Sequence, residues 1–299
     1  NMARPETGTV RFSITPEDAD CKITFTPYID GDIKNEDANY DEQFWNILET
    51  ESDQYRGALL AQTKKLDFRV AYAMNTEITG GEIREVQPIR EDKFTGHHIY
   101  LNARQHETLT ITKYAGVCSS MNHAPEKLMP QARQQAADSA KAGFDELLKE
   151  HTERWDKIWA LSDITIQGDV AAQQGIRFNI FHLNQTYTGE DERLNIGPKG
   201  FTGEKYGGST YWDTEAYCIP FFLMTAPQKV VRNLLVYRYK HLQKSIENAE
   251  KLGFTNGAAL YPMVTMNGEE CHNEWEITFE EIHRNGAIAF AIYNYIRHT

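Results

Sequence analysis

The residue pattern of this chain changes once, close to Pro125, and that change limits the folds available to it. Before it, short segments alternate apolar and polar residues, which is the period of a half-buried strand. After it, apolar residues recur every three or four positions, which is the period of an amphipathic helix. No strand pattern lies between the later helices. The sequence therefore predicts an antiparallel sheet domain followed by a helical part, with no parallel sheet after Pro125.

The strand-like part reaches to about Ser120. Turns rich in Asp, Asn and Gly separate its segments, which are 10–14, 21–29, 67–74, 82–88, 97–103 and 107–114. Short strands at this spacing are typical of an antiparallel β-sandwich. The polar segment 30–55 lacks the D-x-D-x-D-G spacing of a calcium loop, so it is interpreted as a solvated loop.

The helical part begins with the segment 125–160, which is predicted to form one long connecting helix. Later helical patterns follow loops rich in Gly or Asn, over 170–186, 216–224, 227–251 and 279–297. Serial helices without strands between them suit an α/α toroid, in which active-site residues lie on the loops at one rim. We expect a β-sandwich domain at 1–122, a helical linker at 123–188 and the start of an α/α barrel at 189–299.

Charge and composition exclude several classes of protein. The formal net charge is −12, from 43 acidic and 31 basic residues, so binding to nucleic acid or to an anionic membrane through a basic face is not expected. No apolar run has membrane-spanning length, and none resembles a signal peptide. The four cysteines are far apart and include no C-x-x-C pair. A reduced, cytoplasmic setting without a disulfide framework is therefore expected.

The segment 200–223 carries the first group of candidate functional residues. Four glycines precede Tyr211, Trp212, Asp213 and Glu215, and an apolar run follows them. The two aromatic rings offer flat faces with polar tips, and the two carboxylates offer hydrogen-bond acceptors. This combination suits a sugar, which presents apolar C–H faces and hydroxyl donors. The alternative is an ordinary loop whose tryptophan packs on top of a core.

The segment 261–276 carries the second group. Four carboxylates, a histidine, a cysteine and a tryptophan lie within its last eight residues. Glycosyl transfer needs a carboxylic acid of raised pKa and acceptors that orient the sugar. Glu270, Glu274 and Trp275 are therefore candidates for contact with a sugar. His283, at the start of the last helix, is a further candidate and could equally be an interior residue.

The same segment has simpler interpretations. Its glutamates can form an acidic loop that caps the next helix. Cys271 and His272 are adjacent, so they lack the spacing of a zinc site and do not face each other as a nucleophilic pair. No metal site is therefore predicted. No phosphate-binding loop, G-x-S-x-G elbow or dinucleotide-binding fingerprint occurs in the chain.

Taken together, these segments resemble glycoside hydrolase family 65. The resemblance is carried by 200–222, with its Gly-Glu-x-Tyr-Gly-Gly and Trp-Asp-Thr-Glu runs, and by 267–292. The segment 28–37 also resembles the N-terminal sandwich of the family. The second motif is more similar to members that act on maltose than to members that act on kojibiose or trehalose.

The resemblance implies an α+β multidomain fold: an N-terminal antiparallel β-sandwich, a helical linker, an (α/α)6 barrel and a small C-terminal sheet domain. It implies inverting phosphorolysis of an α-glucosidic disaccharide, with maltose as the expected substrate, to β-glucose 1-phosphate and glucose. Inorganic phosphate is the co-substrate, no cofactor is needed, and a homodimer is expected. The resemblance also implies that Trp212 and Asp213 hold the transferred glucosyl unit. Tyr211, Glu270, Glu274, Trp275 and His283 are expected to shape or orient the sugar.

The chain also departs from the family pattern. The proton donor of the family is a glutamate in a Gly-Pro-x-Glu-Tyr motif, and residues 1–299 contain no such motif. The Lys-Gln sugar-binding pair and the phosphate-binding loop of the family are missing too. We therefore expect a fragment that lacks both ends and a donor beyond Thr299, so that this chain alone is inactive. The alternatives are an inverting α-glucoside hydrolase on the same scaffold and a non-catalytic sugar-binding protein.

Overall fold

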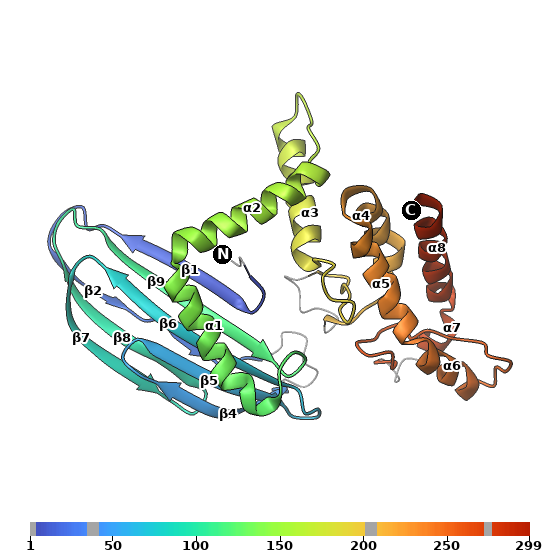
Figure 1. Ribbon diagram of the computed structural model, residues 1–299, viewed down its shortest axis with the longest axis horizontal. Helices are drawn as coiled ribbons and strands as arrows, with labels where there is room; N and C mark the ends of the chain where they lie inside the picture. Colours follow the sequence, from blue (N-terminus) through green and yellow to red (C-terminus); the bar gives the residue numbers. More distant parts are fainter. Residues whose placement is uncertain (1–3, 35–41, 201–207, 272–276) are drawn as a thin grey trace. The chain divides into compact units, whose positions relative to one another are not determined.

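The computed structural model describes residues 4–34, 42–200, 208–271 and 277–299 (Figure 1). The chain forms two compact units, Asn1–Trp155 and Asp156–Thr299. The boundary between them lies inside helix α2 (Phe144–Ser162), and therefore within the predicted linker. The division into three segments at 122 and 188 stays a prediction.

Two antiparallel sheets form most of the first unit. In the larger sheet the strand order is β1-β9-β6-β5-β4, and in the smaller sheet β8 pairs with β2, β3 and β7. The strands are β1 (Thr7–Ile14), β2 (Cys21–Phe25), β3 (Tyr28–Asp30), β4 (Trp45–Ser52), β5 (Arg56–Thr63), β6 (Arg69–Thr79), β7 (Glu82–Arg90), β8 (Phe94–Ala103) and β9 (Leu109–Ser119). Apolar side chains of β2, β8 and β9 form a shared core that includes Phe25, Ile99, Leu101, Leu109 and Ile111.

Strand β4 lies in the segment that the sequence assigns to a solvated loop, and for residues 45–52 that interpretation is wrong. The register of β4 against β5 shifts between Ile47 and Glu49. A bulge of this kind inserts one residue and breaks the period of two on which recognition of a strand depends. The strand is also the edge of its sheet, so it carries more polar residues than an interior strand does.

Helix α1 (Leu128–Ala142) lies across one face of the larger sheet (Figure 1). Alanines of both elements take part in the contact, together with Leu128 and Met129. An added Cβ at Gly116 would lie 2.1 Å from the carbonyl oxygen of Ala132. The single helix predicted over 125–160 is instead a short 3-10 turn, η2 (Pro125–Lys127), followed by α1 and α2. The break falls at Gly143, whose φ of 83° is readily adopted only by glycine.

The second unit is helical. It comprises α3 (Val170–Thr186), a π-helical turn η4 (Thr214–Cys218), α4 (Ile219–Thr225), α5 (Gln228–Lys240), α6 (Leu242–Lys251), α7 (Ile277–Glu280) and α8 (His283–His298). Its core includes Ile219, Phe222, Val231, Leu234 and Ala291. The helix predicted over 227–251 is interrupted at His241, where α5 ends and α6 begins. The predicted fold class, an antiparallel sandwich followed by helices, is confirmed.

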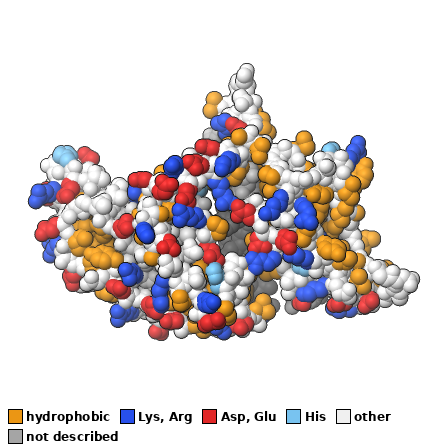
Figure 2. All heavy atoms as spheres, in the orientation of Figure 1, with side chains coloured by type: hydrophobic (Ala, Val, Ile, Leu, Met, Phe, Trp, Pro, Cys, Tyr) orange, Lys and Arg blue, Asp and Glu red, His pale blue; other side chains and the backbone are white. Residues whose placement is uncertain are grey.

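Helix α8 presents an apolar face to solvent. Hydrophobic side chains gather over it in Figure 2, and Phe290, Ile292, Tyr293 and Ile296 are 43–72% exposed. Among the described residues, no helix has both the length and the apolar character that crossing a bilayer demands.

Candidate functional site

An isolated antiparallel bridge joins the two sequence motifs. The backbone N–H of Thr210 donates to the carbonyl of Thr265 over 2.7 Å, and the N–H of Thr265 donates back over 3.1 Å. Both residues are buried, at 4% and 0% exposure. The bridge therefore places the start of the Tyr-Trp-Asp segment beside the middle of the glutamate-rich segment, although the two are more than 50 residues apart in the sequence.

Trp212 lies at the centre of an aromatic group. Its ring meets the ring of His283 edge-on, with centroids 5.0 Å apart and planes at 87°, and the ring of Tyr217 lies 5.6 Å away. Trp212 is half-buried, whereas His283 and Tyr217 are exposed. The structure thus brings together Trp212 and His283, two candidate residues that lie in different segments of the sequence.

Asp213 directly precedes the π-helical turn η4. Its carboxylate does not cap that turn, and the residue is half-buried. Single π-turns are rare and often occur at functional sites. Here the turn carries Thr214 and Glu215 into the interior, at 1% and 0% exposure, so that Trp212 and Asp213 remain at the edge of the unit.

Tyr211 is buried, whereas an aromatic ring that stacks on a sugar must be exposed to it. Its residue exposure is 6%, so the ring packs inside the unit. Its carbonyl oxygen accepts a hydrogen bond of 3.0 Å from Nη2 of Arg238. The structure gives Tyr211 a packing role, and its contact with a sugar stays a prediction.

Glu270 forms hydrogen bonds within its own loop. Its carboxylate accepts hydrogen bonds from the backbone N–H groups of Met263, over 2.6 Å, and Val264, over 3.1 Å. The N–H of Cys271 donates to the carbonyl of Val264 over 2.8 Å. These bonds hold the loop in shape, so a direct contact between Glu270 and a sugar stays a prediction. Glu274 and Trp275 lie outside the described residues.

Two buried arginines complete the framework, and neither is among the residues that the sequence motifs predict. Arg238 binds Glu215 and the Tyr211 carbonyl. Arg284 donates to the carbonyls of Tyr261, Thr278 and Glu281. A signal existed for Arg238: it follows Val231 and Leu234 at helical spacing on the apolar side of α5. A charge on such a stripe indicates a buried ion pair.

Residues at the end of α5 contact the glutamate-rich segment 261–276. The hydroxyl of Tyr237 donates to the carbonyl of Met266 over 2.8 Å, and the ring of His241 meets the Tyr237 ring with centroids 4.4 Å apart. Burial lowers the pKa of His241 to about 4, and the charges of Arg238, Lys244 and Lys240 act in the same direction. His241 is therefore neutral at physiological pH.

Cys218 ends the turn η4, close to the candidate residues. Burial, together with the negative charges of Asp213 and Glu215, raises its pKa to about 12. A thiol with this pKa is protonated at neutral pH and is a poor nucleophile. Covalent catalysis by this cysteine is therefore not favoured.

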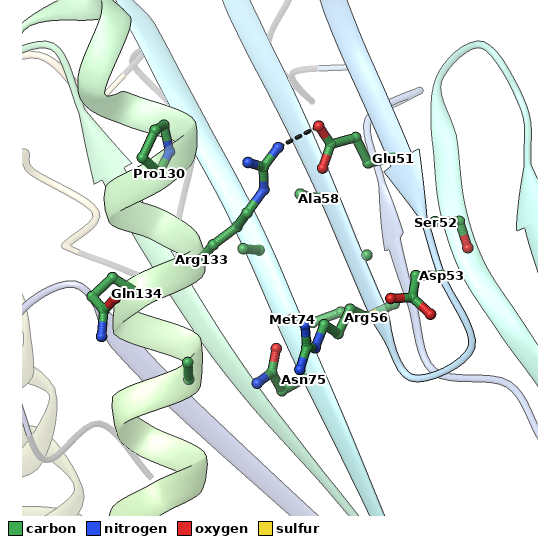
Figure 3. A pocket seen from close by; sticks show the side chains of 13 residues that line it. Glu51, Ser52, Asp53, Arg56, Ala58, Met74, Asn75, Pro130, Arg133 and Gln134 are labelled. Carbon is green, nitrogen blue, oxygen red and sulfur yellow. Dashed lines mark hydrogen bonds and ion pairs between the residues drawn. The ribbon is translucent and has the colours of Figure 1, made fainter.

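The first unit contains a groove of about 610 Å3 between α1 and strands β4 to β6. Figure 3 shows Arg133 reaching from α1 to Glu51 on β4, with which it forms an ion pair, and Asp53, Arg56 and Asn75 along the floor. No residue of either sequence motif lines this groove. The candidate site therefore remains with the loops of the helical unit.

The structure thus combines a β-sandwich with a helical unit that carries aromatic and acidic side chains on its loops. Residues 1–158 match the model of the glycosyl hydrolase family 65 N-terminal domain, and residues 177–299 match that of the family 65 central catalytic domain. The chain belongs to glycosyl hydrolase family 65. The resemblance inferred from the two motifs is confirmed.

Several relatives and one solved structure are similar to this chain. The chain is 48% identical over 282 residues to maltose phosphorylase of Bacillus subtilis (strain 168), covering 94% of this chain and 37% of that protein. It is 30% identical over 307 residues to α,α-trehalose phosphorylase of Thermoanaerobacter brockii, covering 100% of this chain and 39% of that protein. A solved structure assigned as a kojibiose phosphorylase from the human microbiome superposes with a TM-score of 0.86 at 26% identity, covering 98% of this chain and 38% of that chain. The chain thus spans less than half the length of these relatives.

Proposed function

We propose that the full-length protein is a disaccharide phosphorylase that acts on maltose. It transfers the glucosyl unit to inorganic phosphate with inversion and releases β-glucose 1-phosphate and glucose. The observation that carries this proposal is the 48% identity to a maltose phosphorylase over 94% of the chain. Over nearly the whole chain, identity is lower to the trehalose phosphorylase of Thermoanaerobacter brockii, at 30%, and to a kojibiose phosphorylase, at 29%.

In the proposed reaction a phosphate oxygen forms a bond to the anomeric carbon as the glycosidic C–O bond breaks. The bonding electrons leave with the glycosidic oxygen, which takes a proton and becomes a hydroxyl of the released glucose. Phosphate itself is the nucleophile, so the protein needs no nucleophilic side chain, in accord with the neutral thiol of Cys218. We propose that the proton donor is a carboxylic acid beyond Thr299, and that residues 1–299 alone are inactive.

In the proposed reaction, residues of this chain bind and orient the glucosyl unit. The half-buried Asp213 can accept hydrogen bonds from two glucosyl hydroxyls, and bonds to a charged acceptor contribute about 1.5–3 kcal/mol. The Trp212 ring, supported edge-on by His283 at 5.0 Å, offers an apolar face for the C–H side of the sugar. Arg238 holds the backbone directly before these residues. We further propose that the protein acts in the cytoplasm as a homodimer without a catalytic cofactor.

The test is an assay of the full-length protein with maltose, in the presence and absence of phosphate. We expect β-glucose 1-phosphate only when phosphate is present, and at least tenfold lower turnover of trehalose and kojibiose. Glucose release that does not depend on phosphate would identify a hydrolase instead. Sugar binding without turnover under either condition would identify a non-catalytic sugar-binding protein.

A further inference from the structure

Three side chains that can ligate a metal ion meet in the first unit, away from both sequence motifs. They are Glu6, which directly precedes β1, Cys118 near the end of β9, and His123 in the turn that follows. One potential ligand atom from each lies within 4.8 Å of the other two. Glu6 and His123 are 117 residues apart, so spacing in the sequence gives no sign of this cluster.

The separations between these atoms suit a single small ion. The Cys118 Sγ lies 3.7 Å from Oε2 of Glu6, and the His123 Nε2 lies 2.9 and 3.0 Å from the two Glu6 oxygens. With Zn–S near 2.3 Å and Zn–N or Zn–O near 2.0 Å, ligand atoms in a tetrahedral site lie about 3.3–3.6 Å apart. The separations of Glu6 from Cys118 and from His123 lie within roughly 0.5 Å of that range. The ligand atoms of Cys118 and His123 lie within 4.8 Å of each other, so side-chain rotations that bring these two closer complete the site.

The surroundings of the cluster are those of a built site. Cys118 is 0% exposed and packs in the core between the larger sheet and α1. The side chains of Glu6 and His123 are 18% and 22% exposed, which leaves a path for an ion and a position for a water ligand. The amide of Asn122 donates to Oε1 of Glu6 over 3.1 Å and orients that carboxylate, as residues behind metal ligands commonly do.

The backbone of Glu6 is also held in an uncommon conformation. Its φ is 63°, in the left-handed region that residues other than glycine seldom adopt. Its carbonyl oxygen accepts a hydrogen bond of 2.8 Å from the N–H of Val117. The side chain is thereby directed to the end of β9, where Cys118 lies.

We propose that Glu6, Cys118 and His123 form a Zn2+ site, with a water molecule as the fourth ligand. The set of one carboxylate, one thiolate and one imidazole matches the ligand preference of zinc and does not suit Mg2+ or Ca2+, which take oxygen ligands. Binding displaces the thiol proton of Cys118 to solvent, while His123 binds as the neutral imidazole. The ion clamps the segment before β1 to the junction between β9 and the helices.

The experiment uses the full-length protein, purified without chelator. Its metal content is measured by mass spectrometry, and the chelator-treated protein is then titrated with Zn2+, and separately with Co2+ to follow thiolate-to-cobalt charge-transfer absorption. We expect one equivalent of zinc per chain and a cobalt–thiolate band. Cys118→Ser should abolish the band, and both Cys118→Ser and His123→Gln should weaken zinc binding by about tenfold or more.

The matched control is Cys21→Ser, which changes an exposed cysteine on β2 and should leave the metal content and the band unchanged. If Cys118→Ser does not fold, His123→Gln tests the same site, because the histidine is partly exposed.

Absence of stoichiometric zinc and of the cobalt band in the wild type would show that the three residues form only a hydrogen-bonded cluster. Zinc binding that persists in both variants would place the ion elsewhere. Neither outcome depends on phosphorolysis.

Discussion

Arg238 and Glu215 form a two-pronged ion pair in the interior of the helical unit, with Nε to Oε1 at 2.7 Å and Nη2 to Oε2 at 2.9 Å. Their side chains are 3% and 0% exposed. Burial disfavours the charge on the guanidinium, but the Glu215 carboxylate outweighs this, so the pKa of Arg238 is raised. Because Nη2 also binds the carbonyl of Tyr211, the pair connects α5 to the segment that carries Trp212 and Asp213.

Removing one member of this pair should destabilise the protein strongly. Glu215→Gln leaves the guanidinium buried without a counter-charge, and the loss of one partner of a buried pair costs about 3–5 kcal/mol. We expect a fall of that size in the free energy of unfolding, measured by urea denaturation. Arg193→Gln is the control, because it breaks a pair with Asp191 that is 43% and 29% exposed and should cost about 0–1 kcal/mol. Similar costs for the two variants would contradict the role assigned to Arg238 and Glu215.

Asp213→Ala should impair catalysis more than stability. We expect kcat/KM of the full-length enzyme for maltose phosphorolysis to fall at least about a hundredfold, which corresponds to roughly 2.7 kcal/mol. The control is Asp18→Ala, an exposed carboxylate between β1 and β2, which should leave kcat/KM unchanged. Near-normal turnover by a folded Asp213→Ala variant would remove this residue from the site.

Two features favour glycine at position 268: its positive φ and the closeness of the His241 ring. Its φ is 94°, and an added Cβ would lie 2.9 Å from Cγ of His241. Gly253 also has a positive φ, of 85°, but a Cβ there meets nothing within 4 Å. Both Gly→Ala variants carry the left-handed penalty of about 1–2 kcal/mol, so we expect Gly268→Ala to be less stable than Gly253→Ala by at least about 1 kcal/mol. Equal melting temperatures would show that the loop relaxes away from the histidine.

The buried His97 should make the first unit sensitive to acid. Burial lowers its pKa to about 4, its exposure is 0%, and its Nε2 lies 3.0 Å from Oγ1 of Thr76. An unfolded chain binds a proton at this position near pH 6.5. Between these values only the unfolded state is protonated, so the stability contributed by the neutral ring is complete above about pH 6.5 and is lost as the pH falls through about 4.

This loss amounts to roughly 3 kcal/mol, from about 2.5 pKa units at 1.36 kcal/mol each. We expect His97→Gln to be less stable than the parent at pH 7 but to lose correspondingly less stability between pH 7 and pH 4 in urea denaturation. His98→Gln, on the opposite side of β8, serves as the control for loss of a histidine. An unchanged pH dependence in His97→Gln would exclude His97 as the source of acid sensitivity.

Local patterns in the sequence specify the order and type of most elements and the two segments that carry the candidate site. Apolar periodicity is a local property, so it predicted α3 over 170–186 and most strands of the sandwich. Local residue types also selected Trp212 and Asp213, since aromatic and acidic groups beside glycines are visible without the fold. The break at Gly143 had a local signal as well, because glycine commonly ends helices.

Which of these residues lie in contact depends on tertiary packing. The bridge between Thr210 and Thr265, the edge-on contact of Trp212 with His283, and the burial of Arg238 depend on how α5 and α8 pack, and no local pattern encodes that packing. The same holds for Glu6 and His123. Strand β4 was hidden by a bulge whose register is set by its neighbour β5. Contacts between distant segments arise from shape and burial across the whole core, so they follow from the folded arrangement and not from the period of any one segment.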